Sequence, residues 1–271
     1  MQSWWQAAVA NLAWAIATRS RPLRGKAFPG WRMGGRFLGI VMTAAAAIAT
    51  TMVLLDARIA EAVRGSPQWL HILFQEVTDF GKSGWFLWPS GMLLLAIAVL
   101  ASSALPQFSR MVLAACAVRI SFVFMAIALP SLVVTIGKRL IGRARPFVDG
   151  HADPFLYMHP VWRPDYASMP SGHATTGFAA MAAIALIWPR LRIPMLIYAL
   201  LIAASRVVLD AHYLSDVIAG AAVGVGGALL VRDWFAARRL AFVIGADGGI
   251  RRLSAISPVR IKRIVRSLMA P

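Results

Sequence analysis

Charged residues are scarce in this 271-residue chain, and acidic ones are the scarcest. Asp, Glu, Lys and Arg together make up 14% of the sequence, while hydrophobic residues make up 59%. A soluble globular domain carries about 25% charged residues, so this composition argues against an ordinary soluble domain. Cysteine is nearly absent too, because Cys116 is the only one. A single cysteine excludes an internal disulfide.

The shortage of acids leaves a formal net charge of +17. Such a charge can serve nucleic-acid binding, but we expect no nucleic-acid partner, because most of the excess flanks apolar segments and would face anionic lipid. The N-terminus lacks an initial basic region and a small-residue cleavage site, so we expect no signal peptide. There is also no sustained internal repeat.

Long hydrophobic runs are what the sequence has instead. A membrane-spanning helix needs about 20 mostly apolar residues, and six stretches approach that length. The first three are almost free of charge, whereas the last three are shorter and carry polar residues near one end. The sequence therefore predicts an all-α integral membrane protein with six transmembrane helices. The six stretches are Phe37–Leu55, Trp85–Leu105, Met111–Ile136, Gly172–Trp188, Ile193–Leu209 and Tyr213–Val231.

Lysine and arginine are unevenly distributed around these runs. If both termini are cytoplasmic, the inside segments hold 18 of them and the outside segments hold 9. Cytoplasmic loops normally carry the excess, so we predict both termini in the cytoplasm. The chain then divides into a basic segment (1–36), a six-helix domain (37–232) and a second basic segment (233–271). Amphipathic patterns also predict short helices on the membrane surface within 1–18, 69–77 and 258–268.

Three outer junctions between the predicted spans are unusually polar. The first, "GKRLIGRARP", places Lys138 and Arg145 seven residues apart, so that they share a face if the helix continues. Pro146 ends the helix. Two cations on one face suit an anion with several oxygens. The alternative is a basic collar that reaches toward lipid headgroups.

The second junction, "SMPSGH" at residues 168 to 173, opens a helix. A helix N-terminus offers free N–H groups that bind phosphate. Gly172 lets a ligand approach the backbone closely, and Ser171 adds a hydroxyl donor. His173 then lies in the first turn and faces the same ligand. The alternative is a capped helix start with an incidental histidine.

The third junction, "SRVVLDAHYLSD", places His212 and Asp216 four residues apart, on one face of the last helix. A carboxylate that accepts from one ring nitrogen leaves the other free to attack. Arg206 adds a third cation, and Asp210 is read as the N-cap of that helix. The alternative is a structural His–Asp pair. Because all three junctions lie at one membrane face, and ionisable groups at this depth are usually functional, a phosphate monoester is the ligand that fits.

These motifs resemble the three-part signature of the type 2 phosphatidic acid phosphatase superfamily, which also includes vanadium haloperoxidases and bacterial acid phosphatases. The matching pattern is Lys138-x6-Arg145-Pro146, then Pro170-Ser171-Gly172-His173, then Ser205-Arg206-x5-His212-x3-Asp216. The motifs cover about residues 138 to 216, and the six-span layout extends the similarity to about 37–232.

The resemblance implies a role for each matching residue. His212 attacks phosphorus and forms a phosphohistidine, Asp216 orients it, and His173 protonates the leaving alkoxide and then activates water. The phosphate oxygens are held by five groups that stabilise charge in the transition state, without a metal or other cofactor. Those five are Lys138, Arg145, Ser171, Gly172 and Arg206.

The resulting hypothesis is a lipid phosphatase whose substrate sits in the bilayer. Phosphatidylglycerophosphate, phosphatidic acid, undecaprenyl diphosphate and lipid A phosphates all fit. Compact loops and a short, Ala-rich chain favour a bacterial inner membrane with the site facing the periplasm. The alternatives are a phosphotransferase that uses another lipid as acceptor and a carrier that binds lipid phosphate without chemistry. A vanadium-dependent oxidase is disfavoured in a membrane setting. The oligomeric state stays open.

Three further features have simpler readings. The outer loop carries four potential metal ligands, but their spacing matches no known metal site, so loop polarity is the preferred interpretation. Arg119, in the third span, is expected to snorkel or to pair between helices. Gly220 and Gly224 form a small-xxx-small pattern that favours close helix packing. The four loop residues are Asp149, His151, Asp153 and His159.

Overall fold

The computed structural model describes residues 9, 34–101, 105–159 and 162–253. The surface helices expected within 1–18 and 258–268 lie outside this part of the chain, apart from Val9. The helices are α3 (Gly34–Leu54), α4 (Asp56–Arg64), α5 (Gln68–Asp79), α6 (Gly84–Leu100), α7 (Gln107–Ile141), α8 (Gly172–Ile187), α9 (Arg192–Val208) and α10 (Leu214–Ala237). Two 3-10 turns, η1 (Pro164–Tyr166) and η2 (Pro189–Leu191), and two strands, β1 (Phe242–Ile244) and β2 (Ile250–Arg252), complete the fold.

The expectation of a mostly helical membrane protein is confirmed. Five helical segments of the described chain are long and apolar enough to span a bilayer: Phe37–Leu54, Gln68–Val99, Gln107–Ile141, Pro189–Val208 and Leu214–Ala237. The remaining predicted span, Gly172–Trp188, corresponds to α8, which has 16 residues. Such a helix is about 24 Å long at 1.5 Å per residue, while the hydrocarbon core of a bilayer is about 30 Å thick. The count of six spans and the side on which the termini lie therefore remain predictions.

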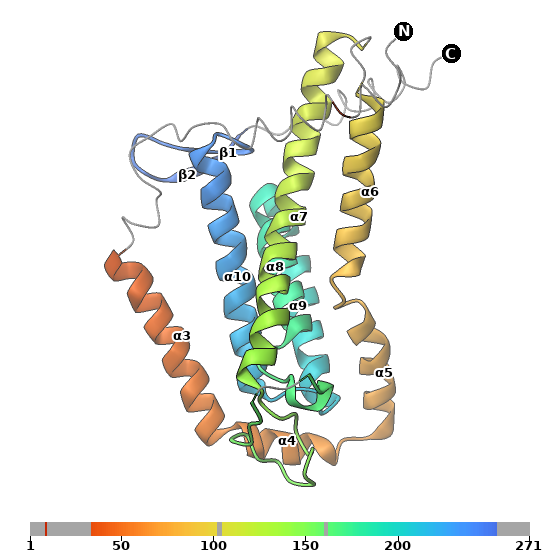
Figure 1. The fold of residues 1–271 in the computed structure, drawn as a ribbon, viewed down its shortest axis with the longest axis vertical. Coiled ribbons are helices and arrows are strands. Elements are labelled where there is room, and N and C mark those ends of the chain that lie inside the picture. The colour runs from red at the N-terminus through yellow and green to blue at the C-terminus, as the bar shows by residue number, and fades with distance from the viewer. Residues whose placement is uncertain (1–8, 10–33, 102–104, 160–161, 254–271) are drawn as a thin grey trace.

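The central bundle consists of α7, α8, α9 and α10, with α6 beside α7 and α3 leaning away on the far side (Figure 1). The apolar side chains of α3 are largely exposed; Leu38 and Ile40, for example, are 60% and 62% exposed. An exposed apolar surface of this kind is costly in water and favourable against lipid. The outer helices therefore present their apolar faces to the bilayer.

A helix forms over 69–77, as predicted, and a second, unpredicted helix precedes it. The amphipathic pattern at 69–77 belongs to α5, which leads into α6 along the length of the bundle (Figure 1). The helix that crosses the end of the bundle is α4 (Figure 1). Helix α5 packs against α9, but Trp69 and Leu73 of the amphipathic pattern are 64% and 51% exposed, so only part of that pattern serves helix packing.

The packing of α10 against α8 depends on glycine, as the small-xxx-small pattern predicts. A Cβ atom added at Gly220 would lie 2.5 Å from the backbone oxygen of Ser171. One added at Gly224 would lie 3.0 Å from the backbone nitrogen of Ala179. These distances leave no room for a side chain. The two glycines therefore let α10 hold the first turn of α8 in place.

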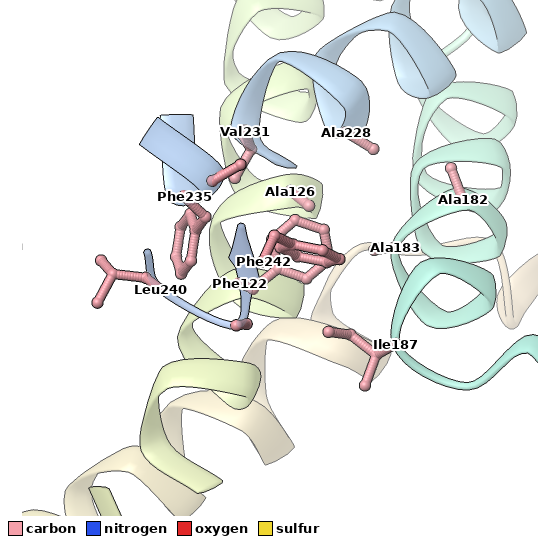
Figure 2. Close-up of a cluster of buried hydrophobic side chains, with 12 residues drawn as sticks. Phe122, Ala126, Ala182, Ala183, Ile187, Ala228, Val231, Phe235, Leu240 and Phe242 are labelled. Carbon is pink, nitrogen blue, oxygen red and sulfur yellow. The ribbon is translucent and has the colours of Figure 1, made fainter. Parts of the chain in front are cut away.

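The last described residues fold back onto the bundle. The strands β1 and β2 pair antiparallel, with Val243 opposite Arg251. Figure 2 shows Phe242 beside Phe122 of α7 and Phe235 of α10. The ring of Phe122 lies 4.8 Å from that of Phe242 and 5.4 Å from that of Phe235, both edge to face. The hairpin is therefore packed against the helices through Phe242.

Candidate active site

The end of α7 separates the first two cations of the site. The helix ends at Ile141, because Gly142 adopts a left-handed conformation with φ of 64°. Lys138 lies in the last helical turn, whereas Arg145 lies beyond the helix, where its backbone N–H donates to the carbonyl of Asp165 at 2.8 Å. The prediction that Lys138 and Arg145 share a helical face is therefore wrong, because the helix does not continue to Arg145.

The motif "SMPSGH" opens a helix as predicted. Ser171 is the N-cap of α8, and its Oγ accepts from the backbone N–H of Ala174 at 3.5 Å. The backbone N–H of Ser171 donates to the carbonyl of Asp216 at 3.0 Å, which ties this helix start to α10. Within the described chain, no atom lies within 4 Å of the position that a Cβ on Gly172 would take. The space in front of this helix N-terminus is open to a ligand.

His212 lies in the loop between α9 and α10 rather than on a helix. The carbonyl of Arg206 accepts from the backbone N–H groups of Ala211 and His212, both at 3.1 Å. The N-cap of α10 is Tyr213, whose backbone N–H donates to the Asp216 carboxylate at 2.9 Å. Two predictions are thereby corrected: His212 and Asp216 do not share a helical face, and Asp210 does not cap α10. Asp210 lies three residues before the cap, with φ of 50°.

Asp216 reaches His212 through a serine. The Nδ1 of His212 lies 3.8 Å from Oδ2 of Asp216, beyond hydrogen-bonding distance. The hydroxyl of Ser168 donates to the same Oδ2 at 2.6 Å, and its oxygen lies 3.4 Å from Nδ1. Because that hydroxyl donates its hydrogen bond to the carboxylate, its oxygen can accept a hydrogen bond from Nδ1–H. With the ring proton on Nδ1, Nε2 is unprotonated. The sequence analysis did not single out Ser168.

A buried ion-pair network holds the other carboxylate oxygen of Asp216, Oδ1. Arg143 is fully buried, and its guanidinium contacts Oδ1 of Asp216 at 2.5 Å and Oδ2 of Asp56 at 2.8 Å. It also donates to the hydroxyl of Ser215 at 2.7 Å and to the carbonyl of Pro154 at 2.9 Å. Burial alone would lower the pKa of Arg143, but the two carboxylates outweigh burial and raise it. Arg143 therefore stays charged and fixes Asp216.

Three arginines have a buried donor without a partner among the described residues, and two of them, Arg145 and Arg206, belong to the predicted site; the third is Arg139. The Nη1 of Arg206 donates to Oγ1 of Thr78 at 2.5 Å, and the residue is 8% exposed. Its buried Nε has no acceptor among the described residues, and the same holds for Nε of Arg145. A buried charged donor left without an acceptor costs more than 1–3 kcal/mol. These nitrogens therefore point to an anion as the missing partner.

The candidate residues gather around the two histidines. His173 interacts electrostatically with Arg206, His212, Lys82 and Lys138. His212 interacts with Arg206 and with Arg145 in the same way. The chain thus brings together three cations, the N-terminus of α8 and both histidines, although they come from separate stretches of sequence. Lys82 is an addition to the predicted set, and it also forms an exposed ion pair with Asp79 at 2.8 Å.

The environment of His212 favours a neutral imidazole. The side chain is 5% exposed. Burial lowers the pKa of His212 below its ordinary value, although the neighbouring Asp216 opposes this, and the cations Arg206 and Arg145 lower it further. An unprotonated ring nitrogen is what a nucleophile needs.

The polar residues of the outer loop support local turns. The carboxylate of Asp149 accepts from the backbone N–H of His151 at 3.2 Å, and that of Asp153 accepts from Phe155 at 2.8 Å. The Nδ1 of His159 lies 3.1 Å from the carbonyl of Leu140. Each of these groups serves the loop backbone.

The chain is similar to several known proteins. A family model described as the PAP2 superfamily matches residues 119–240. A lipid A 1-phosphatase from Rhizobium johnstonii is 32% identical over 80% of this chain and 91% of its own length. Another from Rhizobium etli is 34% identical over 74% of this chain and 86% of its own. Among solved structures, a transmembrane PAP2-type phosphatidylglycerolphosphate phosphatase from Bacillus subtilis has a TM-score of 0.50 at 21% identity, covering 72% of this chain and 91% of that one. At that identity the last likeness concerns the fold alone.

Proposed function

Since this chain belongs to the PAP2 superfamily, we propose that it hydrolyses a phosphate ester of a lipid headgroup through a phosphohistidine intermediate. The observation that carries the proposal is the convergence of two histidines with three cations, two of which have buried donors without a partner. A lipid substrate agrees with the membrane-spanning helices and with the relatives, which are lipid A phosphatases.

In the first step the unprotonated Nε2 of His212 attacks phosphorus. A P–N bond forms as the P–O bond to the lipid breaks, and His173 gives its proton to the departing oxygen. Ser168 and Asp216 hold the Nδ1 side of the ring and stabilise the imidazolium character that develops. In the second step His173 takes a proton from water, the water oxygen attacks phosphorus, and the P–N bond breaks. Inorganic phosphate leaves and both histidines return to their starting state.

The phosphate oxygens need charge stabilisation while bonds change. Lys138, Arg145 and Arg206 supply three positive charges, and the N-terminus of α8 supplies the N–H of Gly172 and the hydroxyl of Ser171. This donor set can stabilise the transition state without a metal ion. We expect phosphate release to be retained in the presence of EDTA. Loss of release would mean that catalysis needs a metal ion.

The phosphate at position 1 of lipid A is the first substrate to test. Both Rhizobium relatives carry that activity in their names, and this chain covers 91% and 86% of their lengths. Lipid A phosphates were among the candidates that the sequence allows. The excess of Lys and Arg lies in the segments on the other side of the predicted membrane domain from the active site. This distribution favours an active site that faces the periplasm of a bacterial inner membrane.

A phosphate-release panel tests the function. Purified protein is given lipid A, phosphatidylglycerophosphate, phosphatidic acid and undecaprenyl diphosphate in mixed micelles. We expect free phosphate from lipid A, lost from position 1, as judged by mass spectrometry of the product. A newly phosphorylated second lipid without free phosphate would indicate the phosphotransferase. Binding of lipid phosphate with no product from any of the four substrates would indicate the carrier.

Ser168 gives a first prediction for the chemistry. In Ser168→Ala the Nδ1–H of His212 loses its near acceptor, and an unsatisfied buried donor costs about 1–3 kcal/mol, or roughly tenfold to a hundredfold in kcat. KM should stay close to that of the unmodified protein, because Ser168 acts on the ring and not on the headgroup. Ser66→Ala is the matched control, since it removes another serine–histidine contact, 2.8 Å from Nε2 of His71. An unchanged kcat in Ser168→Ala would remove the serine from the mechanism.

Gly81 gives a second prediction, because its backbone lies directly against His173. A Cβ at residue 81 would lie 2.8 Å from Cδ2 of His173 and 2.7 Å from Cγ2 of Ile202. Gly81→Ala should therefore push the imidazole aside, and a displacement of about 1 Å can cost roughly 10²-fold in kcat. The loss should be smaller for an aryl phosphate, whose leaving group needs no proton. Equal losses for both substrates would argue against His173 as the acid.

The matched control for Gly81 is Gly65→Ala. The nearest atom to a Cβ at residue 65 is the carbonyl oxygen of Ala62, at 4.0 Å. This variant adds the same methyl group to the same outer region without touching the site. Its kcat should match that of the unmodified protein with both substrates.

A further inference from the structure

A mostly apolar cavity lies at the opposite end of the bundle from the histidines. It has a volume of about 470 Å³ and is bounded by α8, α10, the start of α9 and the β1–β2 hairpin. Helices α8 and α10 both begin at the active site and reach this cavity through their later turns, at Met181 and Leu229 for example. In Figure 1 the hairpin lies at the end of α10 away from α4. The cavity is therefore separate from the catalytic residues.

The lining of this cavity is divided into an apolar part and a basic part. Side chains one helical turn apart on α8 and α10 form apolar walls, as with Met181 and Ala185, and with Val225 and Leu229. The basic part consists of Arg192, Arg232 and Arg252. An apolar groove between membrane helices that ends at several arginines has the form of a site for one lipid. The acyl chain would lie in the apolar part, and the headgroup would lie in the basic part.

Positive charge at this cavity is poorly balanced within the described chain. None of the residues that line it is acidic. Asp233 pairs with Arg232 at 2.6 Å and so neutralises that one charge. Arg252 donates to the carbonyl of Ile187 at 2.9 Å, which leaves its charge uncompensated. Arg192 is exposed and has no acidic partner among the described residues.

Arg119 adds to this positive field. It lies in α7 and donates to the carbonyl of Leu253 at 3.4 Å, next to the end of the hairpin. It interacts repulsively with Arg252. Like charges repel each other, so an anion bound at Arg252 would relieve this repulsion. The position of Arg119 inside an apolar span, left unexplained by catalysis, fits such a role.

We propose that this cavity binds an anionic phospholipid of the surrounding bilayer, as a non-substrate ligand. The phosphate contacts Arg192 and Arg252 at the mouth, and an acyl chain lies along the apolar walls of α8 and α10. Because Phe242 lines the cavity and also packs against Phe122 of α7 (Figure 2), the bound lipid would fasten the hairpin to the bundle. Lipid binding here therefore stabilises the fold without entering the reaction.

The test compares two double variants of the full chain, each of which loses two arginines. Arg192→Gln/Arg252→Gln removes the charges that line the cavity. Arg190→Gln/Arg251→Gln is the control, because these exposed arginines lie close to the first two in the sequence, in η2 and β2, but do not line the cavity; Arg251 instead pairs with the exposed Asp247 at 2.7 Å. Delipidated protein in a neutral detergent is titrated with phosphatidylglycerol, and bound lipid is counted by native mass spectrometry alongside the melting temperature.

Phosphatidylglycerol should raise the melting temperature of the unmodified protein and of the Arg190→Gln/Arg251→Gln control. Its affinity should fall by at least about tenfold in Arg192→Gln/Arg252→Gln, given about 1 kcal/mol for each arginine near a lipid phosphate. Equal weakening in both double variants would overturn the site, since it would reflect general surface charge. Equal binding of phosphatidylcholine would also overturn it, since the arginines would then select nothing.

Two further measurements identify the ligand and the location of its binding site. Inorganic phosphate alone should give no comparable shift, and a full shift with it would mean a phosphate site and not a lipid site. His212→Ala should bind phosphatidylglycerol as tightly as the unmodified protein, whereas loss of binding would locate the lipid at the catalytic end. The single variant Arg192→Gln keeps the test open if loss of Arg252 loosens the hairpin, because the side chain of Arg192 is exposed and does not contact the hairpin through an ion pair.

Discussion

Replacing His212 by alanine is expected to lower phosphate release from the lipid substrate by a factor on the order of 10⁴ or more. The reason is that the proposed reaction passes through a P–N bond to this ring, so its loss removes the path rather than weakening one contact. Substrate binding should survive, because the cations and the N-terminus of α8 remain. The measurement is phosphate release under saturating lipid, with equilibrium binding of the same lipid as the companion assay.

The matched control is His151→Ala, which removes an exposed ring from the outer loop. It should retain full activity. A complementary variant is His173→Ala given an aryl phosphate labelled with ³²P. The first step can then proceed while the second lacks its base, so label should accumulate on the protein as an acid-labile, base-stable adduct. Substantial turnover by His212→Ala, or label that persists on that variant, would rule out the phosphohistidine.

Replacing Arg143 by methionine is expected to destabilise the protein by about 3–5 kcal/mol, the usual cost of breaking a buried ion pair from one side. Methionine fills most of the same volume, but it leaves the carboxylates of Asp56 and Asp216 buried without their shared cation. The measurement is the melting temperature in detergent, followed by circular dichroism. Activity should fall as well, since Asp216 would no longer be fixed behind Ser168.

A second substitution distinguishes charge from packing. In Arg143→Met/Asp56→Asn one of the two stranded charges is removed, so part of the lost stability should return. Arg163→Met is the matched control: its pair with Asp165 spans 3.6 Å with both side chains more than half exposed, and such pairs contribute less than about 1 kcal/mol. If Arg143→Met melts no lower than this control, the buried network does not hold the site together.

The parts of the site predicted from sequence are those with a local cause. The start of α8 follows from the capping ability of Ser171 and from Gly172, and these two residues are adjacent in the sequence. The apolar runs likewise predict the long helices, because membrane helices are defined by length and composition. The motif pattern predicts the residues around the histidines, since its three parts each carry their own polar residues.

What the sequence did not predict depends on contacts between distant segments. The partners Asp56 and Arg143 are 87 residues apart, and Arg143 and Asp216 are 73 apart. No local periodicity reports such pairings. A signal did exist, because Asp56 is a lone carboxylate at the end of the first apolar run. It had no partner nearby in the sequence, and an ionised group at that depth needs one.

The misplaced details have a similar origin. Asp210 has the residue type of an N-cap, yet the backbone turns once more before α10 begins at Leu214. The separation of Lys138 from Arg145 follows from Gly142, whose left-handed conformation is a common way for a helix to end. Helix boundaries are set by such single residues, so a shift of three or four positions changes which side chains share a face.

The shortness of α8 concerns the interior of the bundle, because none of its residues is exposed. Its 16 residues cover about 24 Å, which is less than the roughly 30 Å of a hydrocarbon core. Its first turn, which carries Gly172 and His173, packs among longer helices and can lie recessed below the headgroups. A substrate phosphate would then descend between those helices to reach the catalytic ring, so a thinner bilayer would shorten its path and raise the rate.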